Sequence, residues 1–484
     1  MNHDCQPVRA RLGGATRAGA AGRRRGTSLA VLLTLSCLLP LQASAAADLL
    51  SLFQLATERD PVLKGAQAEL RATLEAFPQA RAGLLPSVGI TANVARNFQQ
   101  VTSQGVTPQQ MTGGDFTFTS GGYRLNVTQP LYHRDRFIQL KQADSRIRQA
   151  QYEVDAVYQE LIVRLAERYF ALLGAADNLD FAGAELTALR RQLEETRQRF
   201  EVGLIAITDV EEAQAGYDLS VAQEIEARNL QDDAREALRE VIGEEPGAIQ
   251  KLREQIPLLS PEPANIAVWA DQALVQNLRV AAAGAAVDTA REEIDRQAAG
   301  HFPTLNLVGR HSFDSADGRF SNVPNPSATG PRFFSGGFLN ETDGTSIGLE
   351  LAVPIFSGGA VVSRTREAAE RHQQAIEQME QARRESYRRT RVAFLGIMTG
   401  ISRIKALKQA VQSSIVSVTS TKAGLEVGTR TAVDVVVNER ALFGARRDYA
   451  RARYNYLLDT LRLKFAAGTL TPGDLAAVNG FLER

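Results

Sequence analysis

The sequence predicts a mixed, mostly α-helical fold made of two copies of one structural unit. Two long proline-free stretches carry heptad-patterned apolar residues, and at 1.5 Å per residue each predicts a helix of about 100 Å. Four other stretches alternate apolar and polar residues, which is the pattern of strands with one apolar face. A short glycine-containing segment follows each of the long helical stretches, and this internal repeat indicates a duplication.

The repeated segment reads FEVGLIAITDV from Phe200 to Val210 and LEVGTRTAVDV from Leu425 to Val435. In both copies a long helical pattern runs into Glu-Val-Gly, and a second helical pattern follows. Gly203 and Gly428 suit the residue just past a helix end, where a positive φ is favoured.

The second helical pattern opens at Thr208 and Asp209 in the first copy and at Val433 and Asp434 in the second. Asp is a good N-cap and favours the positive end of a helix. Taken alone, each copy fits an ordinary helix–turn–helix corner. Because both copies end very long helices, we favour a functional role for the two turns.

The first half, residues 48–263, is expected to run helix, strand, loop, strand, long helix, turn, helix. Ile147, Val154 and Leu161 lie seven residues apart and predict a heptad seam in the long helix. The expected elements are a helix over Asp48–Ala80 with a break at Asp60-Pro61, a strand over Leu84–Phe98, a loop over Gln99–Gly114, a strand over Phe116–Tyr132, and helices over Arg134–Phe200 and Thr208–Val241.

The second half, residues 264–467, repeats this order after a proline-rich loop over Gly243–Pro263. A C-terminal tail, residues 468–484, is expected to be extended or poorly ordered. The expected elements are a helix over Ala264–Ala299, a strand over Pro303–Phe313, a loop over Asp314–Asp343, a strand over Thr345–Phe356, and helices over Ala360–Leu425 and Thr431–Ala467.

Residues 1–47 predict a secretory signal peptide, which is excluded from the fold. Six arginines precede an apolar run from Leu29 to Leu39, and Ala43-Ser44-Ala45 offers small residues for cleavage. Both cysteines, Cys5 and Cys37, lie in this leader, so we expect neither disulfide nor thiol chemistry in the mature chain. Cys37 as a lipoprotein cysteine is a weaker alternative, because Thr34 occupies the position where leucine is expected and the apolar run continues through Leu38, Leu39 and Leu41.

Charge and motifs argue against nucleic-acid binding and catalysis. Cleavage of the leader removes six arginines and one acidic residue, so the 55 basic and 55 acidic residues become 49 and 54. This slightly acidic balance is unlike that of nucleic-acid-binding proteins. The five histidines form no metal-binding spacing, and no nucleophile, metalloprotease or phosphate-loop motif occurs. We therefore expect no enzyme activity, no cofactor and no metal.

The mature chain contains no run of 18 apolar residues, so a membrane crossing would require a closed β-barrel. Four strands are too few for such a barrel, since about eight is the smallest number known. If the strands face lipid, several copies must therefore associate. A small soluble sheet is the alternative that periodicity alone favours.

The two turns and two further segments resemble the TolC family of outer-membrane channel proteins, also called outer membrane factors. The resemblance covers nearly all of the chain after the leader. It rests on VGLIAITDV (Val202–Val210), VGTRTAVDV (Val427–Val435), ARYNYLLDTLRLKFAAGTL (Ala452–Leu470) and AAGHFPTLNL (Ala298–Leu307).

This resemblance implies a homotrimer whose strands form a twelve-stranded barrel in the cell outer membrane, in contact with its lipid. The barrel would be continuous with a coiled-coil tunnel through the periplasm. The implied function is an exit duct for type I protein secretion, multidrug efflux or both. The implied partners are a periplasmic adaptor (membrane fusion protein) and an inner-membrane ABC or RND transporter. The alternative is a periplasmic coiled-coil scaffold without a pore.

The resemblance also implies roles for the turns. Adaptor tips would dock beside six residues, Val202, Gly203, Leu204, Val427, Gly428 and Thr429. A periplasmic gate would be held by Arg430 with Thr208 and Asp209, and Asp434 would form an acidic ring at the entrance.

The chain departs from the family pattern in two places. Val437 stands where a second ring aspartate is expected, and Leu425 where a latch tyrosine is expected. We therefore expect a gate held mainly by Arg430, with one acidic ring and weaker blockade by multivalent cations. The alternative is that Arg430 and Asp209 are solvated residues on unrelated helix ends.

Overall fold

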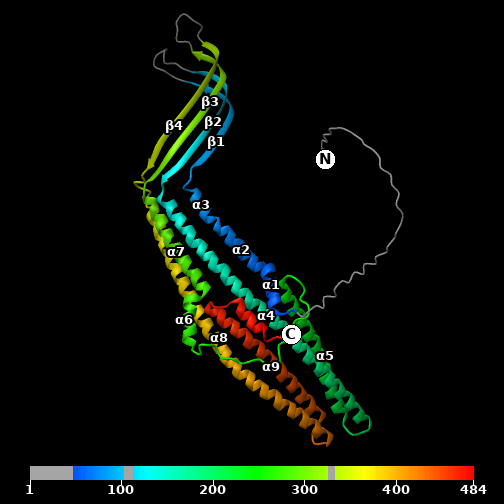
Figure 1. Cartoon of the computed structure of the whole chain (residues 1–484). Helices are drawn as coiled ribbons and strands as arrows, with labels where there is room; N and C mark the ends of the chain where they lie inside the picture. Colours follow the sequence, from blue (N-terminus) through cyan, green and yellow to red (C-terminus); the bar gives the residue numbers. More distant parts are fainter. Residues whose placement is uncertain (1–46, 103–112, 325–332, 484) are drawn as a thin grey trace, which may run out of the picture. The chain divides into compact units, whose positions relative to one another are not determined.

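The computed structural model describes residues 47–102, 113–324 and 333–483 (Figure 1). Apart from Ala47, the expected signal peptide lies outside the described residues, together with Cys5 and Cys37. Most of the expected loop Gln99–Gly114 also lies outside them. Within the described ranges, no helix combines the length and the apolar character that a membrane span requires.

The described chain begins with three short helices, α1 (Leu49–Arg59), α2 (Pro61–Leu74) and α3 (Ala76–Ala82). The expected break at Asp60-Pro61 is confirmed. Asp60 is 2 % exposed; its carboxylate accepts the Leu63 N–H at 2.8 Å and pairs with Arg164 at 2.6 Å. Proline at the first helical position completes a normal helix start.

Four strands form one antiparallel sheet in the order β1-β2-β3-β4 (Figure 1). One face of the sheet carries an apolar set: Ile90 lies opposite Leu125, and Leu307 opposite Leu349. The strands are β1 (Ser87–Val101), β2 (Gly114–Tyr132), β3 (Thr304–Pro324) and β4 (Phe333–Ala352). Because β2 pairs with β3, the sheet joins the two halves of the sequence.

The expected loop over Asp314–Asp343 is wrong, because β3 continues to Pro324 and β4 begins at Phe333. Cross-strand packing supplies the physical reason. Gly336 lies opposite Phe320, and a Cβ added to this glycine would come within 2.8 Å of the phenyl ring. Glycines here make room for aromatic rings, so pairing overrides their low strand propensity.

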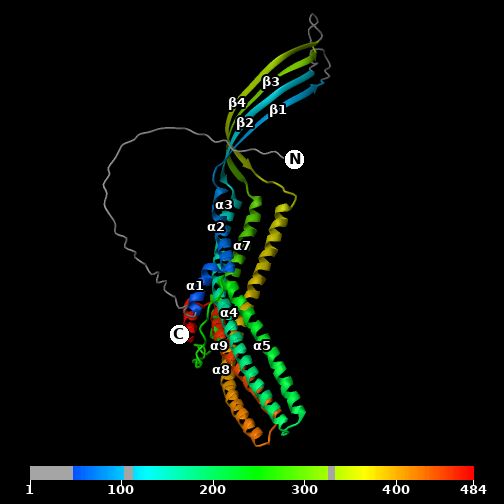
Figure 2. The same cartoon turned by 90° about the vertical axis from the view of Figure 1, so that its right-hand side faces the viewer.

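The long helices are α4 (Arg134–Glu201), α5 (Ile207–Ile242), α8 (Ala360–Glu426) and α9 (Ala432–Ala467), and their expected bounds are confirmed to within two residues. Helix α4 packs against α5 and α9, and α8 packs against α9 (Figures 1 and 2). We call α4 with α5 the first hairpin and α8 with α9 the second hairpin.

The single helix expected over Ala264–Ala299 is instead α6 (Ile266–Gln276), α7 (Leu278–Ala298) and a 3₁₀ turn over Ala299–His301. Asn277 causes the break. Its side-chain oxygen accepts the N–H groups of Arg279 and Val280, which caps α7, and its amide donates to the Ala466 carbonyl. A side chain that caps a new helix competes with continuing the old one.

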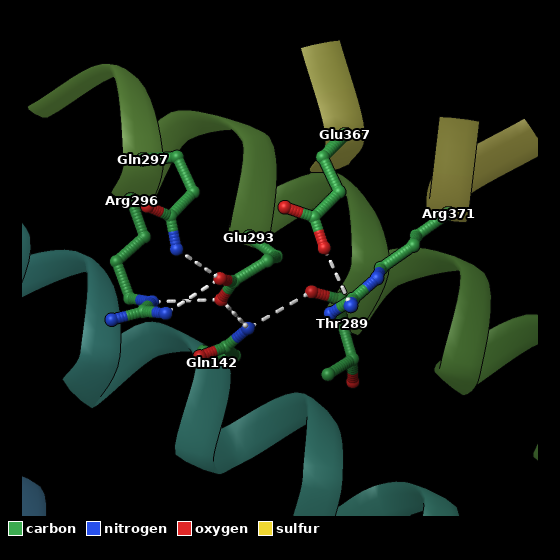
Figure 3. A network of polar contacts seen from close by, with 7 residues as sticks. All are labelled: Gln142, Thr289, Glu293, Arg296, Gln297, Glu367 and Arg371. Carbon is green, nitrogen blue, oxygen red and sulfur yellow. Dashed lines mark hydrogen bonds and ion pairs between the residues drawn. The ribbon is translucent and has the colours of Figure 1, made fainter. Parts of the chain in front are cut away.

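Helix α7 is tied to α4 and lies against α8 (Figure 3). The Glu293 carboxylate accepts hydrogen bonds from Arg296, Gln297 and, across to α4, Gln142 at 3.1 Å. The same Gln142 amide donates to the Thr289 carbonyl.

The expectation of an extended C-terminal tail is wrong. Residues Pro472–Asn479 form helix α10, which begins with a capping box between Thr471 and Asp474. Leu475 and Leu482 are 0 % and 1 % exposed, so the tail belongs to the hydrophobic core with α1, α4 and α9. Backbone hydrogen bonds from Glu483 to Lys251 and from Arg253 to Phe481 fasten it to the inter-half loop.

Candidate functional site at the helix turns

The two glycine turns have the same geometry and lie at the same end of the long helices (Figures 1 and 2). Gly203 has a φ of +76° and Gly428 a φ of +75°. After α4, Leu204 N–H donates to the Arg199 carbonyl at 2.9 Å and Gly203 N–H to the Phe200 carbonyl at 2.8 Å. This pair of bonds is a Schellman closure, in which glycine takes the left-handed position.

The second turn repeats both bonds. Thr429 N–H donates to the Gly424 carbonyl at 2.8 Å, and Gly428 N–H to the Leu425 carbonyl at 3.2 Å. The prediction that Gly203 and Gly428 take a positive φ is therefore confirmed.

Apolar side chains at the turns face solvent within the chain. Val202 and Leu204 are 70 % and 72 % exposed, and Val427 is 74 % exposed. A Cβ added to Gly203 or Gly428 would meet nothing within 4 Å. Both turns thus present exposed apolar side chains beside a glycine with open space around it.

The helix starts after the turns differ from expectation. The N-cap of α5 is Ala206, whose side chain makes no cap, so Thr208 and Asp209 lie inside the first turn of α5. The N-cap of α9 is Thr431 and not Asp434. The N-cap is the residue that keeps an extended backbone just before the helix. The sequence pattern locates this residue only to within a few positions.

Asp434 is instead the second member of a capping box. Its carboxylate accepts the Thr431 N–H at 3.0 Å, and its own N–H donates to the Thr431 hydroxyl at 3.2 Å. The Thr431 N–H, followed by the Thr431 hydroxyl and the charge of Arg430, holds the pKa of this carboxyl below its usual range. Asp434 is therefore ionised at neutral pH.

Arg430 is exposed and folds back over its own turn. A Cβ added to Gly424 would lie 2.7 Å from Arg430 Cγ. In residues 47–102, 113–324 and 333–483, no hydrogen bond or ion pair joins Arg430 to Thr208 or Asp209. One chain alone thus does not bring the expected gate residues together.

The starts of α5 and α9 do lie side by side. They enclose a hollow of about 280 Å³, lined by Asp209, Ala213 and Gly216 from α5 and by Val433, Val436 and Arg440 from α9, among others. Asp209 and the beginning of the second hairpin therefore border the same space.

Sequence reasoning missed two buried carboxylates near this hollow, each paired with a cation. Glu439 is 5 % exposed and pairs with Lys422 at 2.6 Å, and Glu185 is 8 % exposed and faces Arg440. Charged residues on a heptad-patterned helix are typical of a solvated face, so no sequence signal identified them. In the described part of the chain, no cluster of three or more His, Cys, Asp or Glu is arranged to hold a metal ion.

Comparison with known proteins decides the family. The family model described as outer membrane efflux protein matches residues 52–244 and 269–469. The chain belongs to this family. It is accordingly an outer-membrane channel protein with a helical tunnel in the periplasm. The function of its family is transport.

Two curated relatives illustrate the range of the family. The chain is 36 % identical over 458 residues to outer membrane protein TolC of Vibrio cholerae, covering 92 % of this chain and 98 % of the relative. It is 31 % identical to alkaline protease secretion protein AprF of Pseudomonas aeruginosa, covering 90 % and 87 %.

A solved structure supports the fold. The crystal structure of the Campylobacter jejuni CmeC outer membrane channel aligns with a TM-score of 0.70 over 90 % of each chain, at 16 % identity. At that identity the similarity concerns the fold alone, and it confirms the expected combination of strands and long helices.

Proposed function

We propose that three copies of this chain form one outer-membrane exit duct, which passes substrate passively to the outside. The observation that supports the trimer is the exposed apolar face of the sheet and its two free edges in the described chain. Its apolar face is exposed, with Ile90 at 69 % and Ile347 at 78 %, and β1 and β4 are its two edges in the described chain. Twelve strands from three copies would close a barrel and pair every edge.

The proposed assembly includes a periplasmic adaptor and an inner-membrane ABC or RND transporter. The names of the relatives support this: one relative is a protease secretion protein, and the family description refers to efflux. Secreted proteins and small drugs are the two cargo classes we propose. The two family-model matches also support the proposal that residues 48–263 and 264–467 are duplicated halves.

A test of the duct compares it with a scaffold that has no pore. Purified full-length protein should run as a heat-resistant trimer and produce discrete single-channel currents in planar lipid bilayers. Trimers without any current would favour the scaffold.

We propose that the adaptor docks at the two turns, through Val202, Gly203 and Leu204 and through Val427, Gly428 and Thr429. Their exposure and the open space around both glycines support this. Glutamate at Val202 and Val427 should abolish export, because a charge buried against an apolar partner loses its hydration.

The control for docking is Ile225→Glu, at a position on α5 that is 61 % exposed and distant from the turns. Trimers should form in both proteins, and export should fail only when the turns are changed. A photoactivated cross-linker at position 204 that never reaches an adaptor would contradict the proposal.

We propose that the gate is a link from Arg430 to Thr208 and Asp209 of a neighbouring copy, with Asp434 supplying one acidic ring. The exposure of Arg430, which leaves its side chain accessible to a neighbouring copy, supports this. An exposed ion pair contributes about 1 kcal/mol or less, so three copies are needed for firm closure. Val437, 57 % exposed, supplies no second ring.

A further inference from the structure

Arg440 connects the second hairpin to both helices of the first hairpin. Its Nη2 donates to the Gly216 carbonyl of α5 at 3.1 Å, and its Nε lies 3.6 Å from Oε1 of Glu185 in α4. We call these two contacts the Arg440 clasp. Arg440 follows Arg430 by ten residues, so the clasp lies about 15 Å along the helix from the turn.

The clasp lies where the hairpins touch. Gly216 is buried, and a Cβ added there would lie 3.5 Å from Val436 Cγ1 and 3.7 Å from Arg440 Nη2. The side chain of Glu185 is 11 % exposed and that of Arg440 is 33 % exposed. Burial raises the pKa of the Glu185 carboxyl, and the charge of Arg440 opposes this rise. Without Arg440, the carboxylate would be a poorly compensated buried charge, which is costly.

The other polar contacts on the turn side of the clasp stay within one hairpin. In the described ranges they include Arg197 with Gln214, Lys422 with Glu439, and Ser417 with Asn438. The next polar contacts between hairpins lie farther from the turns, at Arg447 with Asn178 and Tyr454 with Asp177. The clasp is thus the polar contact between hairpins that is nearest to the turns in the described chain.

Between the clasp and the turns, α5 and α9 border the 280 Å³ hollow, so part of their facing surface lacks close packing. Close packing would itself resist separation, and a hollow forfeits that dispersion energy. The polar contacts of Arg440 therefore add to the packing of Val436 against Gly216 in holding α9 against α5.

We propose that Arg440 is a positioning residue of the gate, which holds the second hairpin of each chain against the first hairpin of the same chain. The inference rests on the gate proposed above and adds a fastening within one chain to the proposed link between chains. Moving the second turn away from α5 would break both contacts and separate the buried Glu185 from its ion-pair partner.

The test is single-channel recording from full-length trimers that carry Arg440→Met. Methionine keeps the apolar stem and removes the guanidinium. Because a partly buried hydrogen bond from a charged group is lost in each of three chains, the open-to-closed ratio should rise at least about tenfold. Heat-resistant trimers should remain.

The matched control is Lys422→Met. It also removes the cation from a buried carboxylate, that of Glu439, but this pair lies within the second hairpin. Lys422→Met should lower thermal stability and leave the open-to-closed ratio unchanged. A purely structural role for Arg440 predicts the same behaviour for both variants, and that outcome would overturn the inference.

Two outcomes of these recordings distinguish failure of the clasp proposal from failure of the gate proposal. If Arg430→Ser raises conductance and Arg440→Met does not, the gate stands and the clasp is rejected. If neither changes conductance, both are rejected.

A disulfide test covers the case in which Arg440→Met trimers do not form. Residues 48–484 contain no cysteine, so Gly216→Cys with Val436→Cys introduces an isolated pair. In an Arg430→Ser background, the oxidised pair should keep conductance low and reduction should raise it. Equal conductance in both redox states would overturn the inference.

Discussion

The hydrogen bonds to Glu293 should make the protein less stable as the pH falls below 4.5. Glu293→Gln should remove this part of the pH dependence. The carboxylate accepts from Arg296 Nε at 2.7 Å, from Gln297 at 2.6 Å and from Gln142 at 3.1 Å (Figure 3). The hydrogen bonds from Arg296, opposed by burial and aided by the two glutamines, lower the pKa of Glu293 from 4.5 to about 2.

The size of the effect follows from this shift. At 1.36 kcal/mol per pKa unit it corresponds to at most about 3 kcal/mol, and partial solvent screening reduces that to about 1–2 kcal/mol per chain. Because the folded-state pKa is lowered, this stabilisation is fully present above pH 4.5. It is lost as the pH falls from 4.5 towards 2.

The assay is thermal unfolding of wild type and Glu293→Gln from pH 6 to pH 3. Wild type should unfold about 1–2 °C higher at pH 6, and the gap should shrink towards pH 3. The control is Glu367→Gln, which removes a 57 % exposed carboxylate paired with Arg371 on α8 (Figure 3) and should produce almost no gap. A gap for Glu293→Gln that stays constant over this range would refute the reasoning.

Three other substitutions test the fold and the entrance. Gly468→Ala should cost more than about 3 kcal/mol in thermal unfolding, because φ is +77° and the new Cβ would lie 2.2 Å from the Gln276 carbonyl oxygen; an unchanged melting temperature would contradict that geometry. Leu475→Ala should cost about 2–5 kcal/mol, since the side chain is 0 % exposed, and a loss below 1 kcal/mol would mean that α10 is not part of the core. Asp434→Ala should lower the melting temperature slightly through the lost capping box. It should also lower the cation preference measured from reversal potentials, and an unaltered preference would exclude the acidic ring.

Much of the fold could be predicted because long periodic patterns are strong signals. The bounds of α4 and α8 follow from absent prolines, a heptad pattern and a terminal glycine with a positive φ. The repeated turn was recognisable for the same reason, since glycine is favoured where a helix ends in a left-handed residue.

The remaining features depend on partners that a local pattern does not contain. The far parts of β3 and β4 are strands because Phe320 covers Gly336 across the sheet. Helix α10 is short and is stabilised by burial against other helices, although the spacing of Leu475, Val478 and Leu482 was an available signal.

The candidate site divides in the same way. The turns and their exposed apolar residues were predictable, whereas the Arg440 clasp was not. Arg440 and Glu185 lie 255 positions apart and become neighbours only when the hairpins pack. The link from Arg430 to Thr208 and Asp209 stays a prediction.

The measurement that tests the account most directly is the single-channel conductance of wild-type trimers and Arg430→Ser trimers in the same planar bilayers. The account predicts small wild-type currents and clearly larger currents for Arg430→Ser, with equal amounts of heat-resistant trimer. Removing about 0.2–1 kcal/mol per chain at three symmetric positions removes about 0.6–3 kcal/mol in all, which would raise the open-to-closed ratio by about threefold to about 150-fold. Identical conductance in the two proteins would contradict closure at the turns.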